Sequence, residues 1–357
     1  MSSEFGKNLR VSIFGESHGP AVGVVVNGFP AGETVDMEAL RAFMARRAPG
    51  NSPLTTARKE ADLPEFLSGI LDGVLTGTPF AAIIGNMNQR SGDYNGFEDT
   101  PRPSHADYTA RVKWNGAADM RGGGHFSGRL TAPLCVAGGI AKQILERKGI
   151  LIGAHLAKVG NVEDAAFPLY PDGELFDSVS GRALPVLDPE KGAAMETQIR
   201  DAAQDGDSIG GVIECAAVGL PAGLGDPMFD GIENVLASVL FGIPGVKGVE
   251  FGSGFGCAEM RGSEHNDPFV IRDGEIRTAS NHSGGIQGGI TNGMPIVFRI
   301  AMKPTASIAK TQRTVSLSRM EETEFEIHGR HDPCIAVRAV PVAEAAAALV
   351  LLDLILG

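Results

Sequence analysis

Two histidines in glycine- and proline-containing segments are the residues of this chain best suited to proton transfer. His18 stands in Gly15-Glu16-Ser17-His18-Gly19, and His105 stands in Arg102-Pro103-Ser104-His105-Ala106-Asp107-Tyr108. Because imidazole changes its charge near neutral pH, both positions indicate general acid or base chemistry. Each also has a simpler interpretation, since His18 could be a solvated turn residue and His105 could be held structurally by Asp107.

A glycine-rich segment flanked by arginines indicates an anion site. Arg121-Gly122-Gly123-Gly124-His125-Phe126-Ser127-Gly128-Arg129 precedes a helical pattern that begins near Thr131. Backbone N–H groups of successive glycines, together with a helix N-terminus, bind anions. Arg121 and Arg129 would add charge-assisted hydrogen bonds to a phosphate or carboxylate, which argues against the alternative of a flexible glycine hairpin.

Other stretches extend the prediction of an anionic ligand. Glycines between 283 and 290 would let the backbone lie against a planar ligand, and residues 303–307 offer a lysine and two hydroxyls for a phosphate. Residues 329–333 place a cation beside a carboxylate. The run at 252–256 matches a dinucleotide fingerprint only weakly, because it lacks the final glycine spacing and a strong following helix. No metal is expected, because His328 and His331 lie on no carboxylate-rich helix.

Composition narrows the class of protein. The chain has 357 residues, 48 of them glycine, and a formal net charge of −12, which disfavours nucleic-acid and anionic-membrane partners. The four cysteines form no C-x-x-C pair, which is typical of a reducing compartment. The first residues lack the layout of a signal peptide, and the apolar stretch Val342–Leu356 is interrupted by two acids. We therefore expect a soluble, cytoplasmic protein.

Hydrophobic periodicity predicts strands and helices mixed without strict alternation. Strands are expected over residues 9–14, 67–75, 80–84, 150–159 and 210–218. Helices are expected over 34–47 and 131–148, from Asp188-Pro189 onward, and over 341–356, whereas 86–120 is predicted to be a long functional loop. This pattern predicts a single α+β domain, residues 1–357, with helices packed on mostly antiparallel sheet.

With these motifs assembled, the chain resembles the chorismate synthase family over essentially its whole length. The resemblance rests on separate motifs in the family's order. They are Phe14-Gly15-Glu16-Ser17-His18-Gly19, Arg46-Arg47-x-Pro49-Gly50, Arg102-Pro103-x-His105-Ala106-Asp107-Tyr108-Thr109, Gly206-Asp207-Ser208-Ile209-Gly210, Val246-Lys247-Gly248-Val249-Glu250, Gly284-Gly285-Ile286-x-Gly288-Gly289-Ile290, Lys303-Pro304-Thr305-x-Ser307 and Gly329-Arg330-His331-Asp332-Pro333.

This resemblance implies the last common step of the shikimate pathway. In that step, 5-enolpyruvylshikimate 3-phosphate loses phosphate and a ring proton in an anti-1,4-elimination that gives chorismate. Reduced FMN (FMNH2) is required without net redox change, and NADPH would act only as an indirect reductant. Because nothing here resembles a flavin reductase domain, a separate flavin reductase should be a partner. The family fold is a β-α-β sandwich of helices and mostly antiparallel sheets, assembled as a homotetramer.

The resemblance also implies roles for individual residues. His18 matches the histidine thought to protonate or orient reduced flavin, and His105 matches the general acid for the leaving phosphate. Ser17 and Asp332 match a pair proposed to relay the proton from flavin. Substrate anions would meet Arg47, Arg129 and Arg330. Flavin contacts would come from His125, Phe126, Ser127, Pro244, Gly245, Gly288, Lys303, Pro304, Thr305, Ala306, Ser307 and Arg330.

Two departures from the family pattern leave alternatives open. The family usually has Arg-Ser-Ser-Ala-Arg at residues 125–129, where this chain has His-Phe-Ser-Gly-Arg, and Pro53 replaces an expected arginine. Each change removes a bidentate donor, for which His125 could compensate only when protonated, unless Arg58 reaches the site. A catalytically impaired flavin- or anion-binding homologue is thus one alternative, and a flavin enzyme for another anionic substrate is a second. The presence of both histidines favours the active enzyme.

Overall fold

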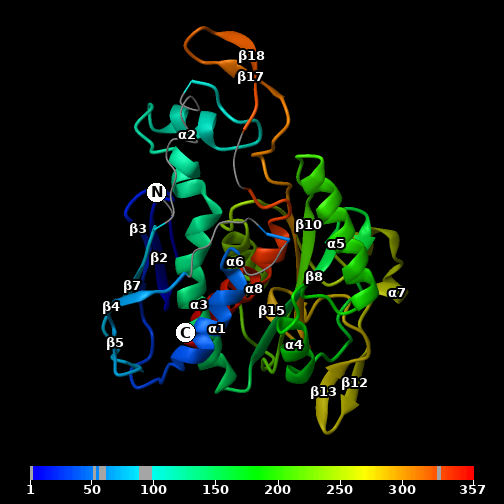
Figure 1. Ribbon diagram of the computed structural model, residues 1–357. Helices are drawn as coiled ribbons and strands as arrows, with labels where there is room; N and C mark the ends of the chain where they lie inside the picture. Colours follow the sequence, from blue (N-terminus) through cyan, green and yellow to red (C-terminus); the bar gives the residue numbers. More distant parts are fainter. Residues whose placement is uncertain (1–2, 51–53, 56–61, 88–98, 328–330) are drawn as a thin grey trace.

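Two antiparallel β-sheets enclose a layer of helices (Figure 1). This computed structural model describes residues 3–50, 54–55, 62–87, 99–327 and 331–357. In Figure 1 the first sheet is blue, the second contains the green strands labelled β8 and β10, and α1, α3 and α8 run between the two sheets. The predicted α+β class, with helices against antiparallel sheet, is confirmed by this arrangement.

The first sheet packs one face on the helical layer. Its strand order is β1-β2-β3-β7-β4, and its strands are Glu4–Phe5, Arg10–Gly15, Ala21–Asn27, Phe80–Gly85 and Glu65–Ser68 in that spatial order. On β3, Val22, Val24 and Val26 are fully buried because alternate residues of a strand point to the same face.

The second sheet lies on the other side of the helices. Its strand order is β11-β16-β10-β8-β9, with strands Val246–Phe251, Ile296–Met302, Gly211–Val218, Leu151–Val159 and Val162–Glu163. Alternate residues of β16 are buried, and the strand runs directly into the segment 303–307 that the sequence marked as a candidate site.

Helices α1 (Met37–Arg47), α3 (Thr131–Glu146) and α8 (Ala336–Ile355) form the central layer. Close approach of α3 and α8 requires glycine at 138, because a Cβ there would lie 2.4 Å from the Cβ of Ala345. Glu344 on α8 is buried and accepts hydrogen bonds from Arg46 of α1 and Lys142 of α3. Burial alone would raise the pKa of Glu344, but these two cations lower it to about 2. One buried carboxylate therefore links all three helices.

The remaining elements cover the sheets and form hairpins. Helices α4 (Gly173–Ser180) and α5 (Pro189–Gln204) pack against β8, and α6 (Ile232–Leu240) packs against β11 and α8. The other helices are α2 (Asp107–Lys113) and α7 (Gly262–His265), with short 3-10 turns at Arg121–Phe126, Gly128–Leu130, Met228–Asp230 and Gly254–Glu259. The hairpin strands are β5 (Ile70–Leu71), β6 (Val74–Leu75), β12 (Phe269–Arg272), β13 (Glu275–Thr278), β14 (Ile286–Gln287), β15 (Ile290–Thr291), β17 (Gln312–Ser316) and β18 (Glu321–Phe325).

Three predicted elements differ from the structure. The single strand expected over 67–75 was wrong, because the chain turns at Gly69 and again at Asp72-Gly73, all with positive φ, which divides it into β4, β5 and β6. The expected long loop contains α2, a helix too short to show clear periodicity. The last helix begins at Ala336 rather than Pro341, so the proline lies inside it near its beginning.

A buried histidine between two carboxylates joins β8 to β10. His155 is fully buried, its Nδ1 lies 3.0 Å from Asp164 Oδ2, and its Nε2 lies 3.0 Å from Glu214 Oε2. Burial alone lowers the pKa of His155, but the hydrogen bonds to both carboxylates outweigh it and raise the pKa above 6.5. The folded chain therefore holds the proton of His155 more tightly than a water-exposed histidine does.

The pH dependence of folding should report this cluster. Because the folded pKa of His155 is raised, its stabilisation is complete below about pH 6.5 and is lost as the pH rises through the raised value. We expect His155→Gln to lower the free energy of unfolding by about 3 kcal/mol at pH 6, because it leaves two buried carboxylates without their cation. The difference in unfolding free energy between the parent and His155→Gln, measured by urea titration, should become smaller towards pH 9. A deficit independent of pH would contradict a charged His155.

Candidate active site

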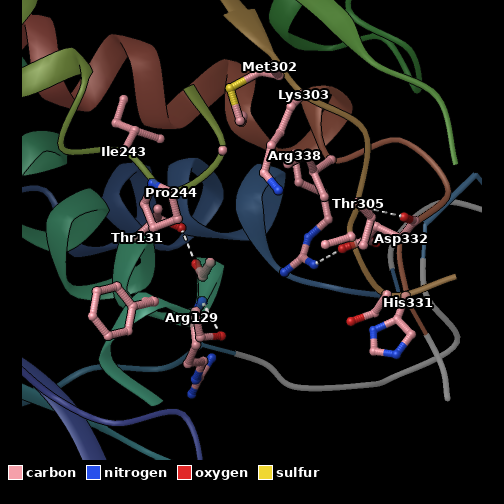
Figure 2. Close-up of a pocket in the computed structure, with 18 of the residues that line it drawn as sticks. Arg129, Thr131, Ile243, Pro244, Met302, Lys303, Thr305, His331, Asp332 and Arg338 are labelled. Atoms are coloured by element: carbon pink, nitrogen blue, oxygen red, sulfur yellow. Dashed lines mark hydrogen bonds and ion pairs between the residues drawn. The ribbon is translucent and has the colours of Figure 1, made fainter. Parts of the chain in front are cut away.

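A cavity of about 270 Å³ lies where helices α3 and α8 begin (Figure 2). Neither helix has an acidic residue in its first turn, and the N-cap residues Leu130 and Ile335 provide no side-chain hydrogen bond to the N-terminal N–H groups. Because the start of a helix carries partial positive charge, both ends favour a bound anion. The rest of the wall comes from the end of α1, the His105 loop, the glycine turn at 121–129, and residues 243–245 and 302–307.

The glycine turn brings the two predicted histidines to one place. Gly122, Gly123 and Gly124 all have positive φ, a conformation that other residues rarely adopt. A Cβ on Gly122 would lie 2.3 Å from His18 Cδ2, and a Cβ on Gly123 would lie 3.2 Å from His105 Nε2. The backbone of two successive glycines therefore packs against both imidazoles, which come from segments far apart in the chain.

His105 lies on the cavity wall and is held by a carboxylate. Its Nδ1 is 2.7 Å from Asp107 Oδ1, and Arg102 donates to the same carboxylate through Nε and Nη2, both at 2.7 Å. Burial lowers the pKa of His105 below 6.5, the hydrogen bond to Asp107 opposes this, and Arg102 adds to the lowering. With Nδ1 bound to Asp107, Nε2 is the ring atom available at the Gly123 side.

The backbone before His105 is fixed by Lys303. Ser104 has φ +60°, and Lys303 Nζ donates to its carbonyl at 2.6 Å and to its hydroxyl at 3.0 Å. Burial and the neighbouring Lys247 lower the pKa of Lys303. The lysine expected to hold a phosphate thus also positions the loop that carries His105.

Ser17 and His18 lie directly behind the glycine turn. Ser17 is 2% exposed and its hydroxyl donates to the carbonyl of Arg121 at 3.1 Å, while His18 is 5% exposed. Neither belongs to the described cavity wall, but Gly122 belongs to it and touches both. The pair is therefore separated from the cavity by backbone alone.

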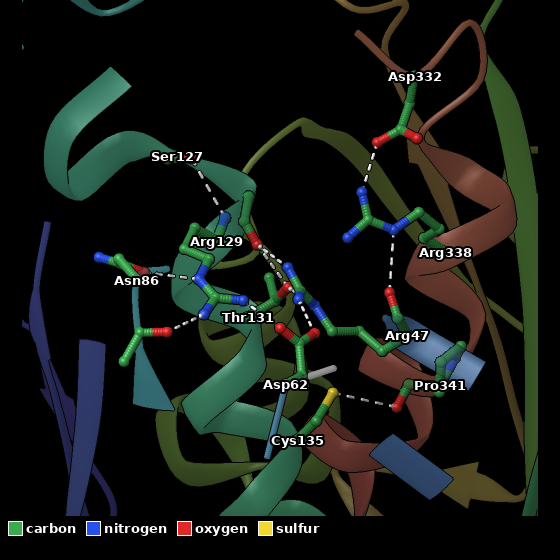
Figure 3. Close-up of polar contacts among 12 residues, drawn as sticks. Arg47, Asp62, Asn86, Ser127, Arg129, Thr131, Cys135, Asp332, Arg338 and Pro341 are labelled. Carbon is green, nitrogen blue, oxygen red and sulfur yellow. Dashed lines mark hydrogen bonds and ion pairs between the residues drawn. The ribbon is translucent and has the colours of Figure 1, made fainter. Parts of the chain in front are cut away.

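A buried carboxylate bridges two of the predicted substrate arginines (Figure 3). Asp62 is fully buried and its two oxygens accept hydrogen bonds from Arg47 Nη1 and Arg129 Nη1. Although burial by itself raises the pKa of Asp62, the two guanidinium groups lower it below 3.8. Asp62 therefore stays ionised and offsets one of the two positive charges beside the cavity.

Further hydrogen bonds fix both guanidinium planes. Arg47 donates from Nε to Thr131 Oγ1 at 3.0 Å and from Nη2 to the Gly128 carbonyl at 2.9 Å. Arg129 donates from Nε to Asn86 Oδ1 at 2.9 Å, and a backbone carbonyl accepts from its Nη2 at 3.2 Å. Each guanidinium nitrogen thus already has a protein acceptor.

Comparison with known proteins identifies the family. A family model described as chorismate synthase matches residues 9–356. The chain is 46% identical to the chorismate synthase of Lancefieldella parvula, over 99% of this chain and 96% of that protein, and 49% identical to that of Thermococcus kodakarensis, over 98% and 96%. A crystal structure of chorismate synthase superposes with a TM-score of 0.77 at 28% identity, covering 99% of this chain and 93% of the other. The chain belongs to the chorismate synthase family. It is accordingly an enzyme of the lyase class, in aromatic amino acid biosynthesis.

Most residues that the family resemblance singled out line the cavity of this chorismate synthase family member. They are His105, Asp332, Arg47, Arg129, Phe126, Ser127, Pro244, Gly245, Lys303, Pro304, Thr305, Ala306 and Ser307. Arg330 lies outside the described residues, as do the departure at Pro53 and its suggested substitute Arg58.

Two predicted flavin contacts lie away from the cavity wall. His125 bonds through Nδ1 to the Gly15 carbonyl at 2.8 Å and through Nε2 to Ser3 Oγ at 2.7 Å. Gly288 lies in the turn between β14 and β15, where the carbonyl of the next glycine accepts from the N–H of Ile232. His125 therefore ties the N-terminal segment to the end of β2, and its ring nitrogens contact the Gly15 carbonyl and Ser3.

Arg338 is a cavity residue that the sequence analysis missed. It lies in the first turn of α8, and its Nη1 donates to Asp332 Oδ2 at 2.6 Å (Figures 2 and 3). The apolar pattern at residues 341–356 predicts a buried helix that begins only at Pro341. A basic residue six positions after Asp332, in a helix otherwise rich in alanine and valine, was the available signal.

Proposed function

We propose that this chain catalyses the anti-1,4-elimination of phosphate and a ring proton from 5-enolpyruvylshikimate 3-phosphate to give chorismate. The observation that carries the proposal is that His18 and His105 meet at one glycine turn beside an arginine-walled cavity. Two helix N-termini and a lysine add the positive potential that a phosphate ester with two carboxylates needs. The site thereby gathers positive charge within a chain of net charge −12.

His105 is the proposed general acid. As the carbon–oxygen bond breaks, the leaving phosphate accumulates negative charge, and a proton from Nε2 neutralises it. The pKa of His105 is lowered in the described chain, and a phosphate dianion facing the ring would raise it in the complex. Asp107 would hold the ring in place while that proton moves, because it accepts from Nδ1.

Reduced FMN is the proposed cofactor, and the residues present fit it. The cavity wall combines apolar side chains, including Phe126 and Met302, with the lysine and hydroxyls of residues 303–307. An apolar face suits the ring system, and Lys303, Thr305 and Ser307 suit its phosphate. When bound, reduced flavin supplies transient electron donation without net redox change.

The proton-handling residues around the flavin are also part of the proposal. His18 would orient or protonate reduced flavin from behind Gly122, and Ser17 with Asp332 would relay the ring proton. Asp332 lies on the cavity wall, whereas Ser17 lies on the far side of the glycine turn. This arrangement supports separate proton tasks for the two histidines.

The proposed partners are further copies of the chain and a separate flavin reductase that uses NADPH. Exposed apolar side chains on the β12–β13 hairpin, including Phe269, Ile271 and Ile276, support association with further copies because such surface is commonly covered by a subunit. The homotetramer is the assembly that the family resemblance implies. Among the described residues, no helix combines the length and the apolar character needed to cross a bilayer. We propose a cytoplasmic location.

An anaerobic turnover assay tests the proposed function. Purified protein with chemically reduced FMN should convert 5-enolpyruvylshikimate 3-phosphate with equal release of phosphate and appearance of chorismate absorbance. Ligand binding in calorimetry without turnover would instead support the impaired homologue. Turnover with another phosphate ester, but not with this one, would indicate the different-substrate alternative.

A further inference from the structure

Arg338 occupies a position that is unfavourable for a cation unless an anion is nearby. It is the third residue of α8, where the helix presents partial positive charge, and its side chain is only 17% exposed. Burial lowers the pKa of Arg338, while Asp332 opposes that effect. The positive charge of Arg338 therefore lies at the positive end of a 20-residue helix, where a negatively charged group nearby would stabilise it.

Two hydrogen bonds fix the orientation of the Arg338 guanidinium. Nε donates to the Arg47 carbonyl at 2.9 Å, and Nη1 donates to Asp332 Oδ2 at 2.6 Å. Both acceptors belong to residues that line the cavity, and together they fix the plane of the group before any ligand arrives (Figure 3). Such preorganisation lowers the entropy lost when a ligand binds.

Arg338 differs from the two predicted substrate arginines in which of its guanidinium nitrogens bond to protein. A guanidinium has five N–H donors, and in Arg47 and Arg129 each nitrogen already bonds to protein. Arg338 Nη2 has no hydrogen bond to any described residue. In Figure 2 this nitrogen points into the space between Arg129 and His331.

We propose that Arg338 is an oxyanion-binding residue of this site, in which Nη2 binds an oxygen of the phosphate or of the ring carboxylate and Asp332 holds the guanidinium in position. The inference rests on the proposed function, because it names a further contact for the same class of ligand. It also gives Asp332 a positioning role beside the proton relay.

The test is equilibrium binding of three probes without flavin. Inorganic phosphate carries only the phosphate group, shikimate carries only the carboxylate, and shikimate 3-phosphate carries both. We expect Arg338→Gln to weaken binding of shikimate 3-phosphate by about 10- to 100-fold in calorimetry, the usual effect of losing a hydrogen bond between charged groups. If Arg338→Gln weakens the binding of inorganic phosphate but not of shikimate, Nη2 binds the phosphate. If it weakens the binding of shikimate but not of inorganic phosphate, Nη2 binds the carboxylate.

Matched variants keep the result interpretable. Arg338→Lys retains the charge but loses the fork and should recover part of the affinity, whereas Arg200→Gln on exposed α5 should bind like the parent. Asp332→Asn should weaken the binding of shikimate 3-phosphate, and in the double variant its effect should not add to that of Arg338→Gln. If circular dichroism shows that Arg338→Gln is unfolded, the affinities of Arg338→Lys and Asp332→Asn for shikimate 3-phosphate test the proposal instead.

The outcomes separate the two proposals. If the parent binds shikimate 3-phosphate but all folded Arg338 variants bind it equally well, the inference is overturned and the proposed function stands. If the parent neither binds the probes nor turns over 5-enolpyruvylshikimate 3-phosphate, the proposed function fails as well.

Discussion

Replacing His105 with alanine should lower kcat by about 10²- to 10⁴-fold while KM changes by less than about threefold. The imidazole contacts Asp107 and Gly123 at the cavity wall, and proton donation to a leaving phosphate matters only as the carbon–oxygen bond breaks. In the proposed ground-state complex the substrate would be held mainly by the arginines and helix N-termini of the cavity wall, which this variant leaves intact. Phosphate release at saturating substrate, with reduced FMN and no oxygen, measures the effect.

Asp107→Asn is the matched control for this role because it keeps the shape of the side chain. Removing the carboxylate charge removes an influence that raises the pKa of His105, so that pKa should fall further. Activity that depends on protonated His105 is lost as the pH rises through its pKa. The alkaline limb of the kcat profile should therefore shift to lower pH in Asp107→Asn. An unchanged kcat in His105→Ala would exclude general acid catalysis by this residue.

The histidine site could be predicted because its signals are local. His18 and His105 each lie in a short run of glycine, proline and polar residues, and the glycine turn at 122–124 can be recognised in the sequence without the fold. Helices α1 and α5 were found for the same reason, since the caps Asp36 and Asp188 stand directly before them, and α3 was found from the periodicity of its own segment. Local patterns therefore indicated the two candidate histidines that the structure brings together at the glycine turn.

The charge arrangement could not be predicted because it depends on contacts across the chain. Asp62 reaches Arg129 across a sequence separation of 67 residues, and nothing near Asp62 in the sequence marks it as a partner. His125 appeared to be a possible flavin contact, yet its ring is bonded to Gly15 and Ser3. Arg338 was hidden in an apolar helix whose first turn could not be located from its pattern. Tertiary packing decides each of these cases.

Asp62→Ala should cost about 3 to 5 kcal/mol of folding free energy at pH 7, the usual effect of removing one partner from a buried ion pair. The substitution leaves Arg47 and Arg129 facing each other without the carboxylate that separates their charges. Urea unfolding measures the loss, and Asp273→Asn, at an exposed turn position, should change stability by less than about 0.5 kcal/mol. If Asp62→Ala also loses less than about 0.5 kcal/mol, the contact of Asp62 with Arg47 and Arg129 does not contribute to folding stability.

Added phosphate should restore part of that stability. In the parent chain, Asp62 already occupies the place between the two guanidinium groups, so phosphate must bind elsewhere on the cavity wall. In Asp62→Ala, an oxyanion can take that place, and binding to the folded state alone raises stability in proportion to RT ln(1 + [L]/Kd). The gain in unfolding free energy at a given phosphate concentration should therefore be larger in the variant than in the parent. Equal gains would mean that Arg47 and Arg129 do not form an anion site even when their buried counter-ion is removed.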